Sequence, residues 1–284
     1  MSEKHRDLFL LALACLIIGI PMYWFQSTHL IHFNVDWNIA FYPATRLLLQ
    51  GQNPYSVGRL HIPIWGLIPL IPFAVLGHDL GGLLLFFFNL FTYAYVGYRF
   101  KGKPVALISL LLSPLVFYNL FLGNIDSLVL WGLLLPPPIG LFLIAIKPQI
   151  GIGVAVYLAY ALWREGGWRK LLPAFAPVTV ALVISFLVLG NWVANTSEDV
   201  MTSYWNFSFF PWSVPIGLFL LIVAIVRRKI AVSLSASPFF APYISVGSWF
   251  VAFMGLLENN LAMVGAVFGL WLLYAAYAAL HGGP

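Results

Sequence analysis

The sequence predicts an all-α polytopic membrane protein, with residues 1–284 forming a single transmembrane domain. Three observations support this fold class. Hydrophobic residues make up 62% of the chain and charged residues only 8%, whereas soluble domains contain about 25% charged residues. Apolar runs of about 15 to 20 residues recur along the chain, and each approaches the length of a membrane span. Lysines and arginines gather in short clusters between these runs, as topology signals do.

Eleven apolar segments are expected to form helices: 8–25, 63–76, 80–98, 104–121, 124–135, 138–147, 149–163, 171–190, 213–227, 238–257 and 260–280. The first is expected to remain as an uncleaved helix, since no clear signal-peptide cleavage site follows it. The second is short and contains three prolines. We therefore expect 63–76 to dip into the membrane without crossing it.

The positive charges predict the topology, because they collect on the cytoplasmic side of membrane proteins. If the N-terminus is cytoplasmic, eleven of the fourteen cations lie inside and three outside. The inner set is Lys4, Arg6, Arg99, Lys101, Lys103, Arg164, Arg169, Lys170, Arg227, Arg228 and Lys229, and the outer set is Arg46, Arg59 and Lys147. This gives about ten transmembrane segments, some short or broken, with both termini cytoplasmic.

Residues 124–163 must begin outside and end inside, which fits three short crossings. The three prolines at 136–138 would then turn near the inner side, and residues 147–149 would turn in the outer half. Broken helices at membrane depth are tolerated where they line a cavity. We therefore expect a cavity that opens to the outside. In the last helix, Gly265 and Gly269 indicate a helix-packing contact, with a homodimer seam as the alternative.

The first outer loop contains a polar stretch that ends in a clear turn signal. Residues 36–50 are expected to form an amphipathic helix at the interface. Its apolar face would carry Trp37, Phe41, Ala44 and Leu48, and its polar face Asp36, Pro43, Arg46 and Gln50. Gly51 can end this helix. Asp36 either caps the helix start, where the helix dipole favours a carboxylate, or takes part in chemistry.

Several polar residues in apolar surroundings are further candidates. An ammonium such as Lys147 costs about 2.5–3.5 kcal/mol at the centre of a membrane helix. A fixed anion or a watery cavity would offset this cost; alternatively, the side chain reaches the outer interface. Asn124 and Asp126 open a short helix, either as caps or as functional groups. Glu258, in the turn before the last helix, is expected outside, as a solvated residue or a ligand contact.

Missing motifs exclude other classes of function. The chain has no phosphate-loop, GxSxG, HExxH, CxxC or GxGxxG motif, and its cytoplasmic loops are too short to fold into a domain. We expect no cofactor and no bound metal, since His29, His32 and His61 do not complete a ligand set. The pI near 9.3 reflects topology signals, so nucleic acid is not an expected partner.

The stretch "DWNIAFYPATRLLLQGQNPY" (36–55) resembles the first outer loop of the polyprenol-phosphate-mannose-dependent mannosyltransferases of the GT-C glycosyltransferase superfamily. That loop contains an aspartate, an aromatic-rich helix, a leucine run and G-x-[ND]-P-Y. The segment "PIWGLIPLIPFAVLG" (63–77) is similar to the proline-rich piece that follows. "GNIDSLVLWGLLL" (123–135) and "IAIKPQIGI" (144–152) resemble the later motifs. The resemblance covers residues 34–163.

The resemblance implies an inverting, metal-independent enzyme with a GT-C-like fold. It would move a sugar, expected to be mannose, from a polyprenyl-phosphate donor to a glycan or glycolipid acceptor. Asp36 would be the general base. Lys147 would bind the donor phosphate, with Arg46 and Arg59 as second candidates. The candidate substrate-binding residues are Trp37, Tyr42, Tyr55, Asn124, Asp126 and Glu258.

The expected location is a prokaryotic plasma membrane, with the active site on the outer face. Membrane lipid is an expected partner, and a protein partner or a second copy of the chain is an alternative one. A non-enzymatic membrane subunit or scaffold that keeps this fold is the second hypothesis. A transporter is the third, although inverted repeats with paired broken helices are its usual signature, and only one such region is found.

Overall fold

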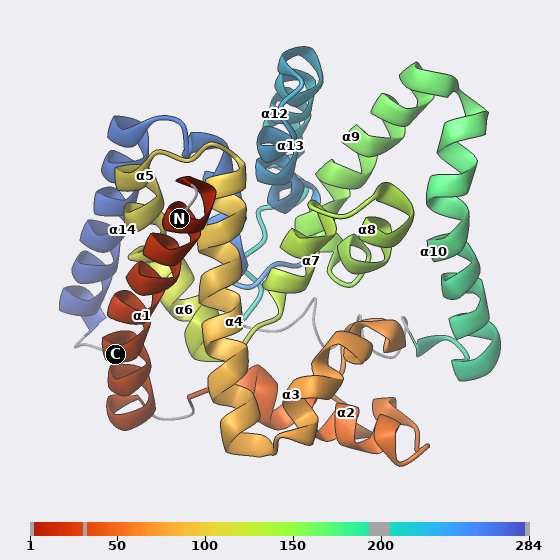
Figure 1. Cartoon of the computed structure of the whole chain (residues 1–284), viewed down its shortest axis with the longest axis horizontal. Coiled ribbons are helices and arrows are strands. Elements are labelled where there is room, and N and C mark those ends of the chain that lie inside the picture. The colour runs from red at the N-terminus through yellow and green to blue at the C-terminus, as the bar shows by residue number, and fades with distance from the viewer. Residues whose placement is uncertain (1–2, 31–32, 193–204, 282–284) are drawn as a thin grey trace.

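The computed structural model describes residues 3–30, 33–192 and 205–281, and all regular secondary structure in them is helical (Figure 1). Four helices in these residues are long and apolar enough to cross a membrane. They are α1 (Glu3–His29), α4 (His78–Arg99), α10 (Trp168–Leu189) and α14 (Asn260–His281). These helices support a multi-pass helical membrane protein. The ten predicted crossings are not confirmed.

A bent pair of helices provides a possible fifth span. α5 (Pro104–Leu111) and α6 (Pro114–Leu122) meet at an angle of 49°. The sequence predicts one helix here, but Pro114 cannot continue the helical hydrogen-bond ladder. The Ser113 hydroxyl instead accepts a hydrogen bond from Val116 N at 3.2 Å and caps the new helix. The bend therefore has a local cause that the hydropathy of the run does not reveal.

The first outer loop forms the predicted helix with one modification. A π-helical turn, η1 (Trp37–Phe41), runs directly into α2 (Tyr42–Leu49). Gly51 has φ +70°, a conformation that glycine adopts readily, and the chain turns there. Next come η2 (Pro54–Val57), η3 (Ile64–Leu70) and α3 (Ile71–Val75). The proline-rich segment 63–76 forms short helices beside α2 (Figure 1), in agreement with a segment that does not cross.

Residues 126–146 form a short helical hairpin instead of two crossings. α7 (Asp126–Gly132) and α8 (Pro137–Ile144) have seven and eight residues, about 12 Å each, which is well short of a 30 Å membrane core. Gly132 and Gly140 bring the two backbones together, since a Cβ on Gly140 would lie 2.2 Å from the Gly132 carbonyl oxygen. α9 (Pro148–Gly166) then follows.

A second hairpin replaces the predicted crossing at 238–257. After α12 (Val214–Arg227), α13 (Ile230–Ala236) and η4 (Ser237–Phe240) run one way, and η5 (Gly247–Leu256) returns. The two arms are joined where Gly255 N donates to Ser235 Oγ at 2.8 Å. Residues 241–246 form a non-helical tip, which Pro242 favours because it cannot continue a helix. We call residues 230–256 the C-terminal hairpin.

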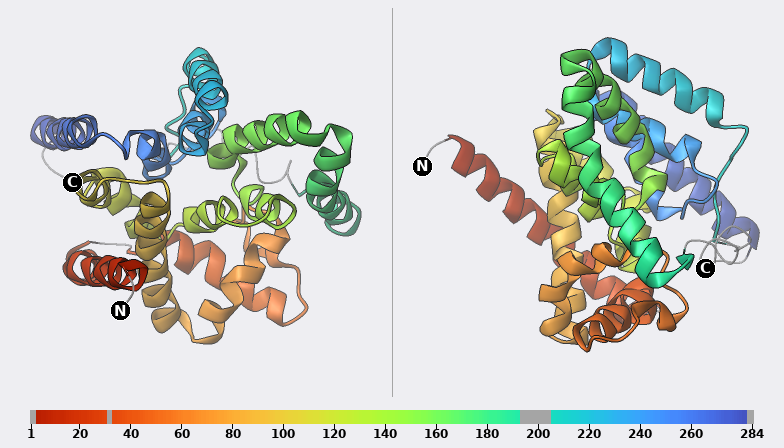
Figure 2. Two further views of the ribbon diagram at one scale, coloured as in Figure 1. Left: turned by 45° about the horizontal axis from the view of Figure 1, so that its top comes forward. Right: turned by 90° about the vertical axis from the view of Figure 1, so that its right-hand side faces the viewer.

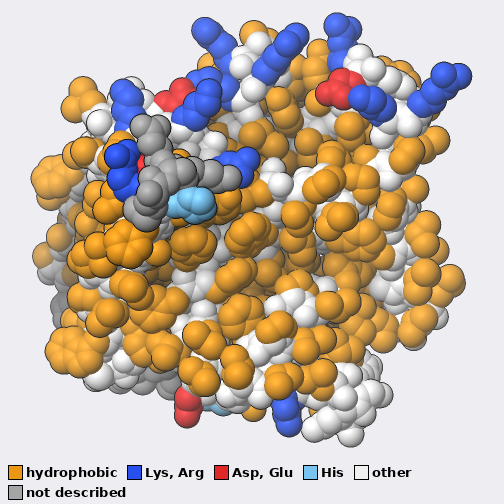
Figure 3. Space-filling view, viewed as in Figure 1, with side chains coloured by type: hydrophobic (Ala, Val, Ile, Leu, Met, Phe, Trp, Pro, Cys, Tyr) orange, Lys and Arg blue, Asp and Glu red, His pale blue; other side chains and the backbone are white. Residues whose placement is uncertain are grey.

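The basic clusters lie together at one end of the molecule, here called the basic end. It comprises the α4–α5, α9–α10 and α12–α13 connections, at the top of Figure 1, and Figure 3 shows lysine and arginine side chains along the same edge. Glu258 pairs with Lys229 at 2.5 Å, and Lys103 N donates to Leu257 O at 2.9 Å. Glu258 therefore lies at the basic end, and the expectation that it faces away from these clusters is wrong.

The last helix leaves the basic end, where Asn260 Oδ1 accepts a hydrogen bond from Ala106 N at 3.1 Å, and runs toward the opposite end (Figure 1). The predicted location of both termini on one side is thus not confirmed. The predicted packing contact of Gly265 and Gly269 is not found within the described residues, because a Cβ on either glycine would meet nothing within 4 Å.

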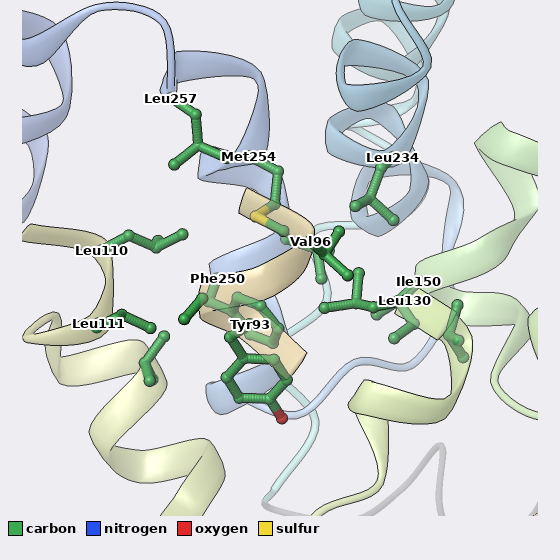
Figure 4. Packing of buried hydrophobic residues seen from close by; sticks show 14 of the residues in the cluster. Tyr93, Val96, Leu110, Leu111, Leu130, Ile150, Leu234, Phe250, Met254 and Leu257 are labelled. Atoms are coloured by element: carbon green, nitrogen blue, oxygen red, sulfur yellow. The ribbon is translucent and has the colours of Figure 1, made fainter. Parts of the chain in front are cut away.

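The core lies between α4, the α5–α6 pair and the C-terminal hairpin (Figure 4). Tyr93 and Phe250 are fully buried, with ring centroids 4.5 Å apart. A second apolar cluster around Trp37 and Leu67 holds η1, α2 and η3 against α4 and α7. Figure 2 shows that α10 and α14 stand at opposite sides of this body, and most of their surface is exposed, as expected for lipid-facing helices.

Candidate functional site

Asp36 lies at the start of η1, which runs into α2, and Figure 1 shows α2 at the end of the molecule opposite the basic end. Its side chain makes no helix-capping hydrogen bond. The capping role that the sequence allows for this carboxylate is therefore not observed. Burial raises the pKa of the Asp36 carboxyl from its usual value to about 6. The Lys147 ammonium opposes this rise and the Asp126 carboxylate adds to it. The three charged groups therefore lie close enough to influence one another.

Lys147 is buried, with only 7% of its surface exposed. It immediately precedes α9. Its ammonium donates to Asn124 Oδ1 at 2.6 Å, to Asp126 Oδ1, and to Ser248 Oγ at 3.4 Å. An ammonium has three hydrogens, so each has an acceptor. The sequence leaves three alternatives for this lysine: a fixed anion, a watery cavity or a side chain that reaches the outer interface. The structure shows the fixed anion, which Asp126 supplies.

Asp126 is fully buried at the first position of α7. Its second carboxylate oxygen accepts a hydrogen bond from Asn119 Nδ2 at 2.8 Å. Asn119 Oδ1 in turn accepts one from the Tyr93 hydroxyl at 2.6 Å. This chain of hydrogen bonds ties the ion pair to α4 and α6. A buried carboxylate of this kind is stable only because both of its oxygens have partners.

Asn124 holds the other side of the ammonium. Its Oδ1 also accepts a hydrogen bond from Ile125 N at 2.7 Å, and its backbone oxygen accepts one from Asn89 Nδ2 at 2.6 Å. Asn89 Oδ1 accepts one from the Ser127 hydroxyl at 2.5 Å. Asn124 thus orients Lys147, and it is not the N-cap of α7, because that position is Ile125. Buried hydrogen-bond networks of this kind are rigid when fully satisfied.

The tip of the C-terminal hairpin reaches the same region. Ser248 contacts the Lys147 ammonium and shares a 3.0 Å hydrogen bond with Ser245. Burial raises the pKa of the Tyr243 hydroxyl to about 12, and the nearby charges of Asp36 and Asp126 contribute to the rise. The sequence interpretation missed these residues because it treats 238–257 as a single crossing. The prolines at 238 and 242 were the available signal that the helix breaks in this segment.

Other predicted site residues lie outside this charged group. Trp37 is fully buried and donates from Nε1 to His78 O at 2.9 Å, so it has no free face for a sugar. Tyr42 is partly buried, with its ring 5.5 Å from that of Trp37. Arg46 and Arg59 are exposed. Glu258 belongs to the basic end and is not part of the site.

Tyr55 lies at the edge of the site region. Its hydroxyl donates to Ile62 O at 3.0 Å, and its ring stacks on Trp192 at 5.4 Å. This stacking joins the first outer loop to the end of α10. Tyr55 therefore braces the loop that carries Asp36, and one face of its ring is already occupied by an aromatic partner.

Three kinds of group meet at this site. A buried ion pair of Lys147 with Asp126 is balanced in charge, and the nearby Asp36 carboxylate is an additional negative charge when ionised. Tyr243 is a neutral hydrogen-bond donor at physiological pH, since its pKa is about 12. A carboxyl with a pKa near 6 can accept a proton close to neutral pH. Comparison with protein-family models, with curated proteins and with solved structures gave no match for this chain, so the site is interpreted from its own residues.

Proposed function

We propose that this protein is an integral membrane glycosyltransferase that uses a sugar linked to a polyprenyl phosphate, with mannose as the expected sugar. The acceptor would be a glycan or glycolipid at the face opposite the basic end. The observation that carries the proposal concerns Asp36: its carboxyl makes no helix-capping hydrogen bond, its pKa is raised to about 6, and the charge of the Lys147 ammonium acts on it. The loop resemblance in residues 36–55 supplies the reaction class.

Asp36 is the general base of the proposed reaction. The acceptor hydroxyl attacks the anomeric carbon and passes its proton to the Asp36 carboxylate, while the bond from that carbon to the phosphate oxygen breaks. A base placed in this way contributes about 10²- to 10⁴-fold in rate. Its raised pKa is suited to the task, because a stronger base accepts the proton more readily and is still ionised at neutral pH.

Lys147 is the proposed partner of the leaving phosphate. A polyprenyl-phosphate sugar is a phosphodiester with one negative charge, and the departing phosphate gains a second. A fixed cation stabilises charge that develops in this way. Lys147 already uses all three hydrogens, so a phosphate oxygen must replace one acceptor. The weakest of these contacts is the 3.4 Å one to Ser248, and we expect that exchange.

A non-enzymatic membrane subunit or scaffold is the second candidate. The observation that favours it is the internal neutralisation of Lys147 by Asp126, because a satisfied ion pair needs no ligand. In that case Asp36 would be dispensable for every measured property except stability.

The deciding experiment incubates the purified, reconstituted protein with radiolabelled polyprenyl-phosphate-mannose and a membrane lipid and glycan extract as acceptor. The glycosyltransferase proposal expects a labelled product with the wild-type chain and none with Asp36→Asn. The scaffold candidate expects no product from either protein, together with a partner that copurifies in fixed ratio.

A further inference from the structure

A cavity at the basic end carries an inference that is independent of the proposed transferase site. It has a volume of about 540 Å³ and lies between the beginning of α1 and the end of α4. Its lining combines an apolar side chain, two tyrosines, two cations and a glycine: Leu8, Tyr95, Tyr98, Arg99, Lys101 and Gly102. We propose that this cavity binds the phosphate headgroup of an anionic membrane lipid.

The two cations are available for an anion. Among residues 5–30, 33–192 and 205–281, no carboxylate lies within ion-pair distance of Arg99 or Lys101, although such pairs form elsewhere at the basic end. The Arg99 guanidinium donates one hydrogen bond, to the Tyr95 hydroxyl at 3.2 Å, and has further donors to offer. Asp7, an acid of α1, accepts a hydrogen bond from the Tyr98 hydroxyl at 3.2 Å and lies 3.7 Å from Arg6.

The backbone holds the second cation at the cavity rim. Lys101 has φ +59°, the left-handed conformation in which glycine is the usual residue after a helix. The turn is fixed by hydrogen bonds from Lys101 N to Tyr98 O and from Gly102 N to Gly97 O, at 3.0 and 2.9 Å. A lysine adopts this conformation at a cost that glycine avoids. The turn therefore fixes the backbone from which the Lys101 side chain reaches the cavity.

The position of the cavity identifies a lipid as the source of the phosphate. α1 and α4 are both candidate membrane spans, and the cavity lies where they meet the basic end. Tyrosine and arginine are typical of the headgroup level, and Leu8 offers an apolar surface beside them. Figure 3 shows orange hydrophobic surface directly beneath the edge of blue side chains. Basic pockets between membrane helices bind anionic headgroups in this way.

The chain provides a closely matched control. Arg227 and Arg228 are also exposed at the basic end, and Arg228 also has a left-handed backbone, with φ +54°. Neither residue lines this cavity. The double variant Arg227→Gln/Arg228→Gly therefore makes the same changes in charge and backbone as Arg99→Gln/Lys101→Gly. Introducing glycine relieves the strained conformation in both cases, so we expect both variants to fold.

The test is native mass spectrometry of the delipidated protein titrated with phosphatidylglycerol or phosphatidylcholine. We expect Arg99→Gln/Lys101→Gly to bind phosphatidylglycerol roughly tenfold or more weakly, with phosphatidylcholine unchanged and the control variant like wild type. Arg99→Gln alone should show an intermediate loss. The proposal is overturned if the control variant loses affinity equally, if neither variant changes, or if sn-glycerol 3-phosphate competes as well as the lipid.

Discussion

Lys147 and Asp126 form a buried ion pair across the open ends of the α7–α8 hairpin. The first residue of α7 provides the carboxylate, and the residue before α9 provides the ammonium. Residues 21 apart in the chain meet because the hairpin between them closes at Gly132 and Gly140. The close contact between Gly132 and Gly140, near the turn of the hairpin, thus helps to position the ion pair at its open end.

Removing either charge of this pair should destabilise the protein strongly. Lys147→Met or Asp126→Leu leaves an uncompensated buried charge, and breaking such a pair costs about 3–5 kcal/mol. The double variant Asp126→Leu/Lys147→Met should lose less than the sum of the two, because no charge remains. Thermal unfolding in detergent measures all three. Lys170→Met is the control, since its exposed pair with Glu165 is worth about 1 kcal/mol or less. Additive losses would contradict the coupling.

Asp36→Asn should lower the rate of sugar transfer by about 10²- to 10⁴-fold, because the amide cannot accept the acceptor proton. Donor binding should change little. Asp79→Asn is the matched control. Asp79 lies in the first turn of α4, and its side chain is fully exposed, so this variant should transfer sugar at the wild-type rate. An Asp36→Asn protein with undiminished turnover would remove Asp36 from the mechanism.

The rate of transfer should depend on pH through the same carboxyl. Burial raises the pKa of Asp36 to about 6, and the base acts only when ionised. The value of kcat/KM should therefore be constant above about pH 7 and fall about tenfold per pH unit below pH 6. The residual activity of Asp36→Asn should not show this fall in kcat/KM at low pH. If kcat/KM still falls below pH 6 in that variant, another group is responsible for the fall.

Glu258→Gln should leave sugar transfer within about twofold of wild type. Glu258 pairs with Lys229 at the basic end, away from Asp36, and a half-exposed pair of this kind contributes about 1 kcal/mol or less. The measurement is the same transfer assay, with thermal unfolding alongside it. A large loss of transfer without a loss of stability would place Glu258 in the site after all.

The C-terminal hairpin can be tested by labelling from the two sides of the membrane. Cys15 is the only cysteine of the chain and is buried, so a Cys15→Ser protein gives a clean background. Single cysteines at Lys229 and Glu258 should react with a membrane-impermeant maleimide from the same side. A single cysteine at Asp79 should react from the opposite side. Labelling of 229 and 258 from different sides would instead indicate one crossing between them.

The positions of most helices could be predicted from the sequence because long apolar runs identify helices that face lipid. The bend at Ser113 and the tip at 241–246 were missed, because hydropathy does not show where the chain changes direction and the prolines at 114, 238 and 242 were not used to break these runs. The sequence also marks Asp36 and Lys147 as unusual, and the charge of the Lys147 ammonium acts on the Asp36 carboxyl. It did not pair Lys147 with Asp126, since their contact requires a hairpin whose closure depends on two glycines.

Tyr243 and Ser248 illustrate a second limit. Each comes from a part of the chain that sequence reasoning assigned to a uniform crossing, and neither is unusual by residue type. Both lie in or next to the tip of the C-terminal hairpin, where Ser248 contacts Lys147 and the charge of Asp36 acts on Tyr243. Trp37 is the opposite case: the helical pattern placed it on an apolar face and the resemblance implied contact with a sugar, and the structure buries it completely.

The α7–α8 hairpin also has a practical use. Its turn, residues 133–136, is far from the charges that its ends bring together, and Leu135 and Pro136 are exposed. Exposed turns of this kind tolerate inserted sequence well. An epitope or a small fluorescent reporter could therefore be inserted after Leu135. The Gly132–Gly140 contact would lie between the inserted sequence and the ion pair, and would keep the two helices of the hairpin together.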